Sequence, residues 1–232
     1  MIKAVVFDLD DTLISEKEYI KSGYRHIAEI ISEQNRLNKE LGDKHLIYEV
    51  LIQLFDASPK NVFNRLLDKL EVPYTKDDIL DLVKAYREHK PNIQFYPDVL
   101  PCLEQLKKRG IKTGIITDGY VSTQKNKLIA LGADRYFNFI IVTDELGREY
   151  WKPDPRAFEI MRDKLEVSFD EMIYIGDNPE KDFYIGSIFP IQTVRLVRIS
   201  DEHNHIYIDK DYLKGIKEQY RIFDLYDLFK LF

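Results

Sequence analysis

Two carboxylates that stand two positions apart follow the first apolar run of the sequence. Asp8 and Asp10 belong to the stretch Asp8-Leu9-Asp10-Asp11-Thr12, after an apolar run that begins at Lys3. In an extended chain their side chains fall on the same side, where the two negative charges repel each other. A hard divalent cation such as Mg²⁺ prefers oxygen ligands and would relieve this repulsion. Aspartates after a strand also commonly cap turns, so this stretch alone leaves both interpretations open.

Two further stretches carry groups that could bind a phosphate. Thr117-Asp118-Gly119 combines a hydroxyl with backbone N–H groups at an expected strand-to-helix turn, and Gly119 permits close approach. Lys152 directly precedes Pro153-Asp154-Pro155, and its ammonium group could neutralise a phosphate or an aspartate. Thr-Asp-Gly is also a generic turn, and single lysines are usually solvated, so neither stretch is decisive alone.

A fourth stretch runs from Gly176 to Asp182 and places Asp177 and Asp182 after another apolar run. In a parallel sheet, ligands bind beyond the carboxyl ends of the strands. Four strand ends of this chemistry at one edge of a sheet are much less expected by accident than any one of them. The set therefore predicts a site for Mg²⁺ and a phosphate group.

Apolar runs that alternate with helical segments predict the sheet that such a site requires. Short, β-branched runs are typical of buried strands, and glycines end two of the intervening helical segments. Strand, helix and strand at this spacing favour right-handed crossovers and a doubly wound parallel α/β sheet. The expected strands are 3–9, 112–117, 137–142, 172–175 and 193–199, and the expected helices are 101–109, 124–131 and 155–165.

Residues 14–92 break the alternation, because they carry helix signals and no convincing strand. We therefore expect a small all-helical domain at 14–92, inserted into an α/β core formed by 1–13 and 93–232. The expected helix starts are a capping box at Ser15 and Glu18, a cap and first-turn proline at Ser58 and Pro59, and a near capping box at Thr75 and Asp78.

The composition is that of an ordinary soluble globular protein. Hydrophobic residues make up 44% and charged residues 32% of the 232 positions, which argues against disorder. The net charge of -6 argues against a nucleic acid or an anionic membrane surface as the main partner. Cys102 is the single cysteine, and neither a signal peptide nor an apolar run of about 20 residues is present. We expect a cytoplasmic protein.

The four stretches together resemble the ordered motifs of the haloacid dehalogenase superfamily. The matching segments are FDLDDTL at Phe7 to Leu13, TDG at Thr117 to Gly119, KPDP at Lys152 to Pro155 and GDNPEKD at Gly176 to Asp182. The helical insertion after the first motif is similar to the family's cap, which closes over the active site and excludes water. The segments TDGYVSTQKNKL, TDELG and KPDPRAF further resemble the branch of nucleotide phosphatases and N-acylneuraminate-phosphate phosphatases.

The resemblance implies a two-step hydrolysis of a phosphate ester. Asp8 would be the nucleophile that forms an aspartyl-phosphate intermediate. Asp10 would protonate the leaving alcohol and later activate the water that hydrolyses the intermediate. Thr117 and the backbone N–H groups of Asp118 and Gly119 would hold the phosphoryl oxygens.

The remaining motif residues would balance the charge. Lys152 would offset the negative charge of Asp8 and of the transferring group. Asp177 would complete a Mg²⁺ site with the Asp8 carboxylate and the Asp10 backbone carbonyl, and Asp182 would orient Lys152 or a water at the metal. Metal and lysine together remove the repulsion between a carboxylate and a phosphate dianion.

Two segments depart from the expected pattern. The residues 146–152 carry extra bulk before the lysine, but only Lys152, and not Lys164, has the Pro-Asp-Pro cap. The polar segment 200–219 is expected to be a surface insertion, and a solvated loop explains His203 and His205 better than a metal site does.

The favoured function is a Mg²⁺-dependent phosphatase that acts on a small phosphorylated metabolite, either a nucleotide or a sugar phosphate. Dehalogenation is disfavoured, because it has no use for a Mg²⁺ site. A phosphomutase on the same scaffold and a non-catalytic, phosphate-binding regulatory module remain alternatives. The sequence leaves the substrate and the oligomeric state open.

Overall fold

The computed structural model describes residues 1–33, 43–198 and 210–232, which divide into two compact units. One unit consists of Met1–Glu16 and Ile93–Phe232, and the other of Lys17–Asn92. The sequence predicts the inserted domain at 14–92, which starts three residues before this second unit. The two histidines at 203 and 205 lie outside the described residues.

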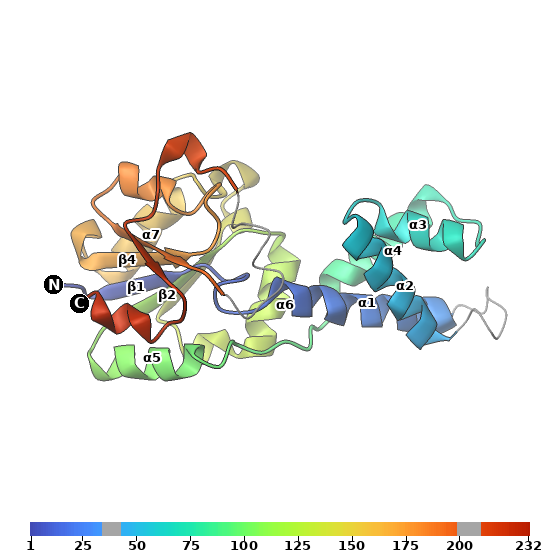
Figure 1. Cartoon of the computed structure of the whole chain (residues 1–232), viewed down its shortest axis with the longest axis horizontal. Coiled ribbons are helices and arrows are strands. Elements are labelled where there is room, and N and C mark those ends of the chain that lie inside the picture. The colour runs from blue at the N-terminus through green and yellow to red at the C-terminus, as the bar shows by residue number, and fades with distance from the viewer. Residues whose placement is uncertain (34–42, 199–209) are drawn as a thin grey trace. The chain divides into compact units, whose positions relative to one another are not determined.

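The first unit is built on a parallel sheet with the strand order β3-β2-β1-β4-β5-β6 (Figure 1). The doubly wound α/β fold that the sequence predicts is confirmed. The short strand β6 was missed, because two of its three residues are exposed and it carries no apolar run. The strands are β1 (Ala4–Phe7), β2 (Lys112–Thr117), β3 (Phe139–Val142), β4 (Met172–Gly176), β5 (Gln192–Leu196) and β6 (Tyr220–Ile222).

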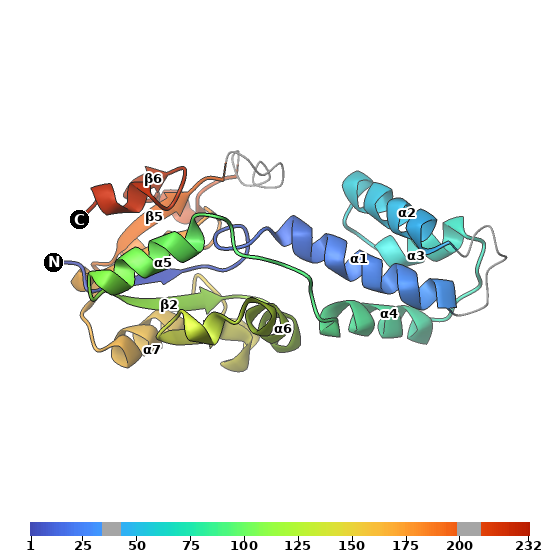
Figure 2. The same cartoon turned by 90° about the horizontal axis from the view of Figure 1, so that it is seen from below.

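The central strands are apolar throughout because helices cover both faces of the sheet. Every residue of β1 and β4 is buried, as expected for a parallel strand that packs on both sides. The helices α5 (Val99–Lys108) and α7 (Arg156–Leu165) lie on opposite faces (Figure 1 and Figure 2). A Cβ atom at Gly114 would lie 2.6 Å from the Met161 sulfur, so the glycine in β2 lets α7 approach the sheet closely.

Local signals set the ends of the helices in this unit. The helix α6 (Val121–Leu131) ends at Gly132, which has φ of 59° and adopts the left-handed conformation that glycine favours. At the start of α7, Pro155 is the N-cap residue, so the expectation that Asp154-Pro155 supplies an aspartate cap and a first-turn proline is wrong by one position. The Arg156 N–H nevertheless donates to Asp154 Oδ1 at 2.8 Å, which holds the turn before the helix. The short 3-10 helices are Ala133–Arg135, Thr143–Glu145, Arg148–Tyr150, Phe169–Glu171, Tyr184–Ser187, Leu213–Gly215 and Asp227–Lys230.

The described residues of the second unit form four helices, the first of which begins at the boundary residue Glu16. Aromatic rings fill its interior, where Tyr24 makes edge-on contacts with Phe55 and Phe63. None of the helices in the described ranges is both long enough and apolar enough to cross a membrane. The helices are α1 (Glu16–Glu33), α2 (Lys44–Ala57), α3 (Val62–Lys69) and α4 (Lys76–Glu88).

Of the helix starts that the sequence predicts in this unit, one is confirmed and one is wrong. The capping box of Thr75 and Asp78 is confirmed, since each residue's side chain accepts the other's backbone N–H. The assignment of Ser58 as an N-cap is wrong, because Ser58 is the C-cap of α2 and its N–H donates to Leu54. The next helix begins only after Asn61, because Asn61 adopts a left-handed conformation with φ of 52°.

The first turn of α1 is stabilised by a hydrogen bond to a residue that precedes it in the chain. The Glu16 N–H donates to Asp11 Oδ1 at 2.9 Å, so a motif aspartate supplies an acceptor to the first turn of the helix. The capping box at Ser15 and Glu18 stays a prediction.

The core packing predicts a large loss of stability when Phe158 is truncated. The Phe158 side chain is 1% exposed and packs edge-on against Tyr174, with 4.8 Å between the ring centroids. We expect Phe158→Ala to lower the free energy of unfolding by about 3–5 kcal/mol, because it leaves a cavity beside the sheet. Urea denaturation measures the change. The control Ile129→Ala, at a 76% exposed position, should change it by less than about 0.5 kcal/mol; similar losses in both variants would contradict this core.

Candidate active site

The motif residues meet at the carboxyl ends of three neighbouring strands. Parallel pairing aligns Phe7 of β1 with Ile115 of β2 and with Ile175 of β4. The strand that ends in Thr117 and the two strands that directly precede Asp8 and Asp177 therefore lie side by side. The convergence that the sequence predicts is thus present in the fold.

Lys152 lies in the loop that follows β3, directly after the bulky residues 146–151, and its side chain contacts Asp8. Its Nζ lies 2.6 Å from Asp8 Oδ1 and 2.9 Å from Asp182 Oδ1, and it donates to the Tyr174 hydroxyl at 2.8 Å. The side chains of Lys152 and Asp182 are fully buried and that of Asp8 is 3% exposed. Lys164, the alternative considered above, instead places its Nζ over the Phe139 ring.

Asp182 is fixed by contacts on both of its carboxylate oxygens. Tyr174 donates its hydroxyl hydrogen to Oδ1 at 3.1 Å, and the Asn178 N–H donates to Oδ2 at 2.9 Å. A Cβ atom at Gly176 would lie 2.4 Å from Asp182 Oδ2, so any side chain at position 176 would displace the carboxylate. Because Asp182 contacts Lys152, Gly176 also helps to fix the lysine beside Asp8.

Burial and mutual repulsion perturb the acidic side chains. Burial raises the pKa of Asp8 from 3.8 to about 6, although Lys152 and Lys181 act in the opposite direction. Burial, followed by the charges of Asp182 and Asp8, raises the pKa of Asp177 well above its usual range. Ionisation of Asp8 and Asp177 is therefore unfavourable in this buried cluster by itself.

The cluster has the donors that a hard divalent cation requires. Carboxylate oxygens of Asp8, Asp177 and Asp182 lie within 4.8 Å of one another. Asp177 Oδ2 is buried and has no hydrogen-bond partner among the described residues, whereas both oxygens of Asp182 are engaged. An unsatisfied buried carboxylate oxygen is costly unless a cation binds it. The residues present thus fit Mg²⁺, with Asp8 and Asp177 as the carboxylates best able to bind it.

Asp10 takes a different environment from Asp8, because its carboxylate faces the helix α6. Lys127 Nζ donates to Asp10 Oδ1 at 2.6 Å, and Gln124 Nε2 donates to Asp10 Oδ2 at 2.9 Å. The Asp10 side chain keeps 21% exposure, whereas the Lys127 side chain is only 2% exposed. No role for these two α6 residues is predicted from the sequence, although their spacing of three places them on one helix face.

The Thr117-Asp118-Gly119 turn is held by side chains from several elements. Gln124 Nε2 also donates to Thr117 Oγ1 at 2.6 Å. Gly119 has φ of 133°, and a Cβ atom there would lie 3.0 Å from the Gln124 side chain. Gly119 therefore leaves room for the Gln124 side chain, while its role in the close approach of an anion stays a prediction.

The Asp118 carboxylate braces the loop that carries Lys152. It accepts hydrogen bonds from Thr143 Oγ1 at 2.8 Å and from the Lys152 N–H at 3.1 Å, both on Oδ1. Its Oδ2 accepts from Lys181 Nζ at 3.2 Å. Burial acts to raise the pKa of Asp118, but Lys152 and Lys181 outweigh it and hold the pKa below the usual range. Lys181 is a second cation near Asp8 to which the sequence assigned no role.

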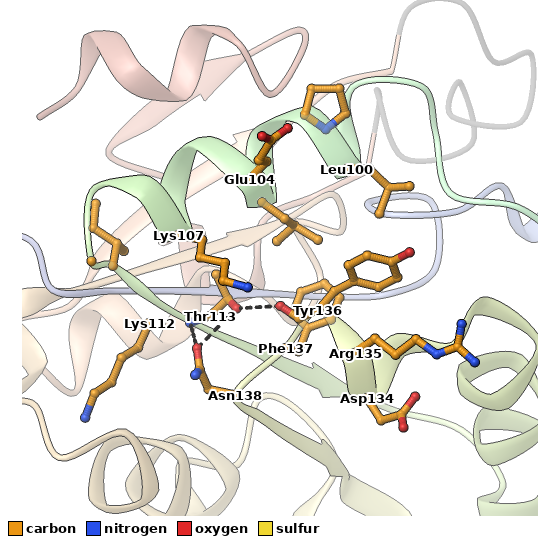
Figure 3. A pocket seen from close by; sticks show the side chains of 14 residues that line it. Leu100, Glu104, Lys107, Lys112, Thr113, Asp134, Arg135, Tyr136, Phe137 and Asn138 are labelled. Carbon is orange, nitrogen blue, oxygen red and sulfur yellow. Dashed lines mark hydrogen bonds between the residues drawn. The ribbon is translucent and has the colours of Figure 1, made fainter.

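A cavity of about 820 Å³ lies at the opposite end of the sheet, near the start of β2 (Figure 3). Thr113 and Asn138 are hydrogen-bonded in its wall, and Lys107, Tyr136 and Arg135 also line it. No residue of the four motifs is among its lining residues. The chemistry of the side chains, and not the size of this cavity, therefore identifies the candidate active site.

Comparisons with known proteins agree with this geometry. Residues 5–195 match the family model described as haloacid dehalogenase-like hydrolase. A glyceraldehyde 3-phosphate phosphatase of Methanopyrus kandleri is 31% identical over 201 residues, which are 85% of each chain. A pyrophosphatase, PpaX, of Oceanobacillus iheyensis is 26% identical over 232 residues, which cover 98% of this chain and 95% of the relative.

Solved structures support the fold in the same way. The putative HAD-hydrolase YfnB of Bacillus subtilis, whose structure is described as magnesium-bound, superposes with a TM-score of 0.67 at 20% sequence identity. The match covers 99% of this chain and 98% of that chain. At this level of identity the likeness concerns the fold.

The acid cluster predicts that Mg²⁺ stabilises the protein more at about pH 7.5 than at about pH 5. Since the pKa of Asp8 rises from 3.8 to about 6 on folding, the folded state binds more protons than the unfolded chain between these values. The stability from this carboxyl is present at low pH and is lost as the pH rises through about 6. A bound cation would offset the ionised carboxylates there. Thermal unfolding with and without Mg²⁺ at both pH values measures the difference.

The matched variants for this test are Asp177→Asn and Asp134→Asn. Asp177→Asn should remove most of the Mg²⁺-dependent rise in melting temperature, because it removes a buried ligand with an unsatisfied oxygen. Asp134→Asn, at an exposed position, should keep the full rise. A rise of equal size at both pH values, or one that survives in Asp177→Asn, contradicts the proposed metal site.

Proposed function

Since this chain belongs to the haloacid dehalogenase-like hydrolases, we propose that it hydrolyses small phosphomonoesters through a phosphorylated Asp8. The family resemblance of the four motifs is thereby confirmed, while the nucleotidase and N-acylneuraminate-phosphate phosphatase branch stays a prediction. The observation that carries the proposal is the buried contact of 2.6 Å between Lys152 and Asp8, beside the unsatisfied carboxylate of Asp177.

In the first half of the reaction, an Asp8 carboxylate oxygen attacks the phosphorus atom of the ester. A bond forms between Asp8 and phosphorus, and the bond from phosphorus to the ester oxygen breaks. Asp10 gives its proton to that oxygen, so the product leaves as a neutral alcohol. Lys152 reduces the repulsion between the attacking carboxylate and the phosphate dianion.

In the second half, a water molecule hydrolyses the aspartyl-phosphate. Asp10, now a carboxylate, accepts a proton from the water as its oxygen bonds to phosphorus. The bond between phosphorus and Asp8 breaks, which releases inorganic phosphate and restores the Asp8 carboxylate. Asp10 is again protonated, so the cycle is balanced.

The proposed Mg²⁺ would be held by the carboxylates of Asp8 and Asp177 and by the backbone carbonyl of Asp10. When bound, it would offset the negative charge that the phosphate adds to the acid cluster. Thr117, through its hydroxyl, and the N–H groups of Asp118 and Gly119 would hold the phosphoryl oxygens. Asp182 would act through Lys152, which it contacts at 2.9 Å.

The helical residues 14–92 are proposed to act as a cap on the core formed by 1–13 and 93–232. In such an arrangement the core supplies the common chemistry and the inserted domain chooses the leaving group. The chain enters this insertion only a few residues after Asp10, through the contact between Asp11 and Glu16.

The nucleophile assignment predicts that Asp8→Asn lowers p-nitrophenyl phosphate turnover by at least about a thousandfold. The amide is nearly isosteric but cannot form the aspartyl-phosphate. The variant should still fold, because Lys152 keeps its contact with Asp182 and the burial cost of the Asp8 charge is removed. Phosphate release and circular dichroism are the measurements, with Asp134→Asn as the control. Substantial turnover by folded Asp8→Asn would exclude Asp8 as the nucleophile.

A panel of phosphorylated compounds tests the substrate class. Because the relative from Methanopyrus kandleri is named a glyceraldehyde 3-phosphate phosphatase, we propose a small sugar phosphate as the substrate. We expect kcat/KM for glyceraldehyde 3-phosphate to exceed that for pyrophosphate and for nucleoside monophosphates by at least about tenfold, which corresponds to about 1.4 kcal/mol of transition-state binding. A nucleotide or pyrophosphate at the top of the panel would overturn the sugar-phosphate assignment while leaving the phosphatase chemistry intact.

A further inference from the structure

The α6 residues Lys127 and Gln124 form a pair of donors on the Asp10 carboxylate, and we call this pair the α6 clamp. Lys127 contacts Asp10 Oδ1 at 2.6 Å and Gln124 contacts Asp10 Oδ2 at 2.9 Å. Asp10 is thus bound at both oxygens by residues that stand 114 and 117 positions away in the sequence. Two directed contacts on one carboxylate fix its rotation as well as its position.

The Lys127 ammonium group lies in an unusual place for a lysine. Its side chain is 2% exposed, whereas lysines are almost never fully buried unless they are paired. A buried ion pair contributes little net stability, because the removal of both charges from water opposes their attraction. The pairing with Asp10 is therefore better explained by what it does to Asp10 than by a gain in folding stability.

The clamp leaves part of the Asp10 side chain exposed. The Asp10 side chain keeps 21% exposure, whereas that of its partner Lys127 keeps 2%. A water molecule can reach a carboxylate that is only partly covered. The carboxylate form that accepts both donors is also the form of Asp10 after it has protonated the leaving alcohol.

Gln124 connects the same carboxylate to the proposed phosphate-binding turn. Its Nε2 donates to Thr117 Oγ1 at 2.6 Å as well as to Asp10 Oδ2, and one amide group has two hydrogens for these two bonds. Because Thr117 Oγ1 accepts from Gln124, its own hydrogen can point toward a phosphoryl oxygen. The space for Gln124 depends on Gly119, since a Cβ atom there would lie 3.0 Å from the glutamine side chain.

We propose that Lys127 and Gln124 are positioning residues, which hold the Asp10 carboxylate where it can take a proton from the water that attacks the aspartyl-phosphate. This inference rests on the proposed function. In the step concerned, the water oxygen bonds to phosphorus, the bond from phosphorus to Asp8 breaks and the water proton passes to Asp10. When the clamp is lost, this step slows more than the formation of the intermediate.

The test compares the variants Lys127→Met and Gln124→Met with p-nitrophenyl phosphate as the substrate. The p-nitrophenolate ion leaves without a proton, so formation of the intermediate needs little help from Asp10. Rapid mixing gives the rate constant of the initial burst of p-nitrophenolate, and the following steady state reports hydrolysis of the aspartyl-phosphate. Acid-quenched protein is assayed for bound phosphate in parallel.

We expect the ratio of burst to steady-state rate constants to rise by at least about tenfold over wild type in both variants. A positioned general base typically raises the rate of its step by roughly 100- to 10,000-fold, and we expect the variants to lose a part of this rate enhancement. Bound phosphate should accumulate accordingly. The control is Lys125→Met on the same helix, whose side chain is 53% exposed and pairs with Glu145 at 2.5 Å; it should keep the wild-type ratio.

The ratio is measured within one sample, so a smaller folded fraction lowers the signal and leaves the ratio unchanged. Equal decreases of both rate constants, no decrease at all, or failure of both variants to fold would overturn the positioning role. Failure of the proposed function is distinguishable, because it shows in the wild type, as absent turnover or as turnover without phosphate bound to Asp8.

Discussion

The rest of the structure depends on one constraint, which is that several buried carboxylates lie close together and few cationic side chains contact them. Asp8, Asp177 and Asp182 bring oxygens within 4.8 Å of one another, and of these three carboxylates the Lys152 ammonium group contacts Asp8 and Asp182. Burial and repulsion raise the pKa values of Asp8 and Asp177, so the ionised cluster is unfavourable by itself. Such a site is suited to a cation and, with the cation bound, to a phosphate dianion. An acidic protein can thereby bind an anionic substrate.

A chain of side-chain contacts joins the hydrophobic core of the sheet to the charged residues of the site. Phe158 packs against Tyr174, and the Tyr174 hydroxyl contacts both Lys152 and Asp182. Gly176 leaves room for Asp182, so the backbone of β4 also determines where the lysine lies. The Asp10 carboxylate instead contacts the α6 residues Lys127 and Gln124. The two proposed roles, nucleophile and acid-base group, thus fall to two aspartates in different environments.

The sequence predicts those features that depend on local pattern. The apolar runs before Asp8, Thr117 and Asp177 predict the strands and, with them, the shared edge of the sheet. Features that arise from distant contacts were missed. Lys127 resembles any helix lysine until the fold brings it to Asp10, and β6 pairs with β5 although its own residues are mostly exposed. Ser58 followed by proline imitates a helix start, but the left-handed Asn61 sets the actual boundary.

The central claim is that phosphate passes through Asp8, and trapping the intermediate tests it most directly. The protein would be mixed with a labelled phosphomonoester and Mg²⁺, quenched in acid and digested, and the phosphorylated peptide would be identified by mass spectrometry. The account predicts one acid-stable, hydroxylamine-sensitive phosphoryl group on the peptide that contains Asp8. Turnover with no bound phosphate, or with the phosphoryl group on another residue, would contradict it.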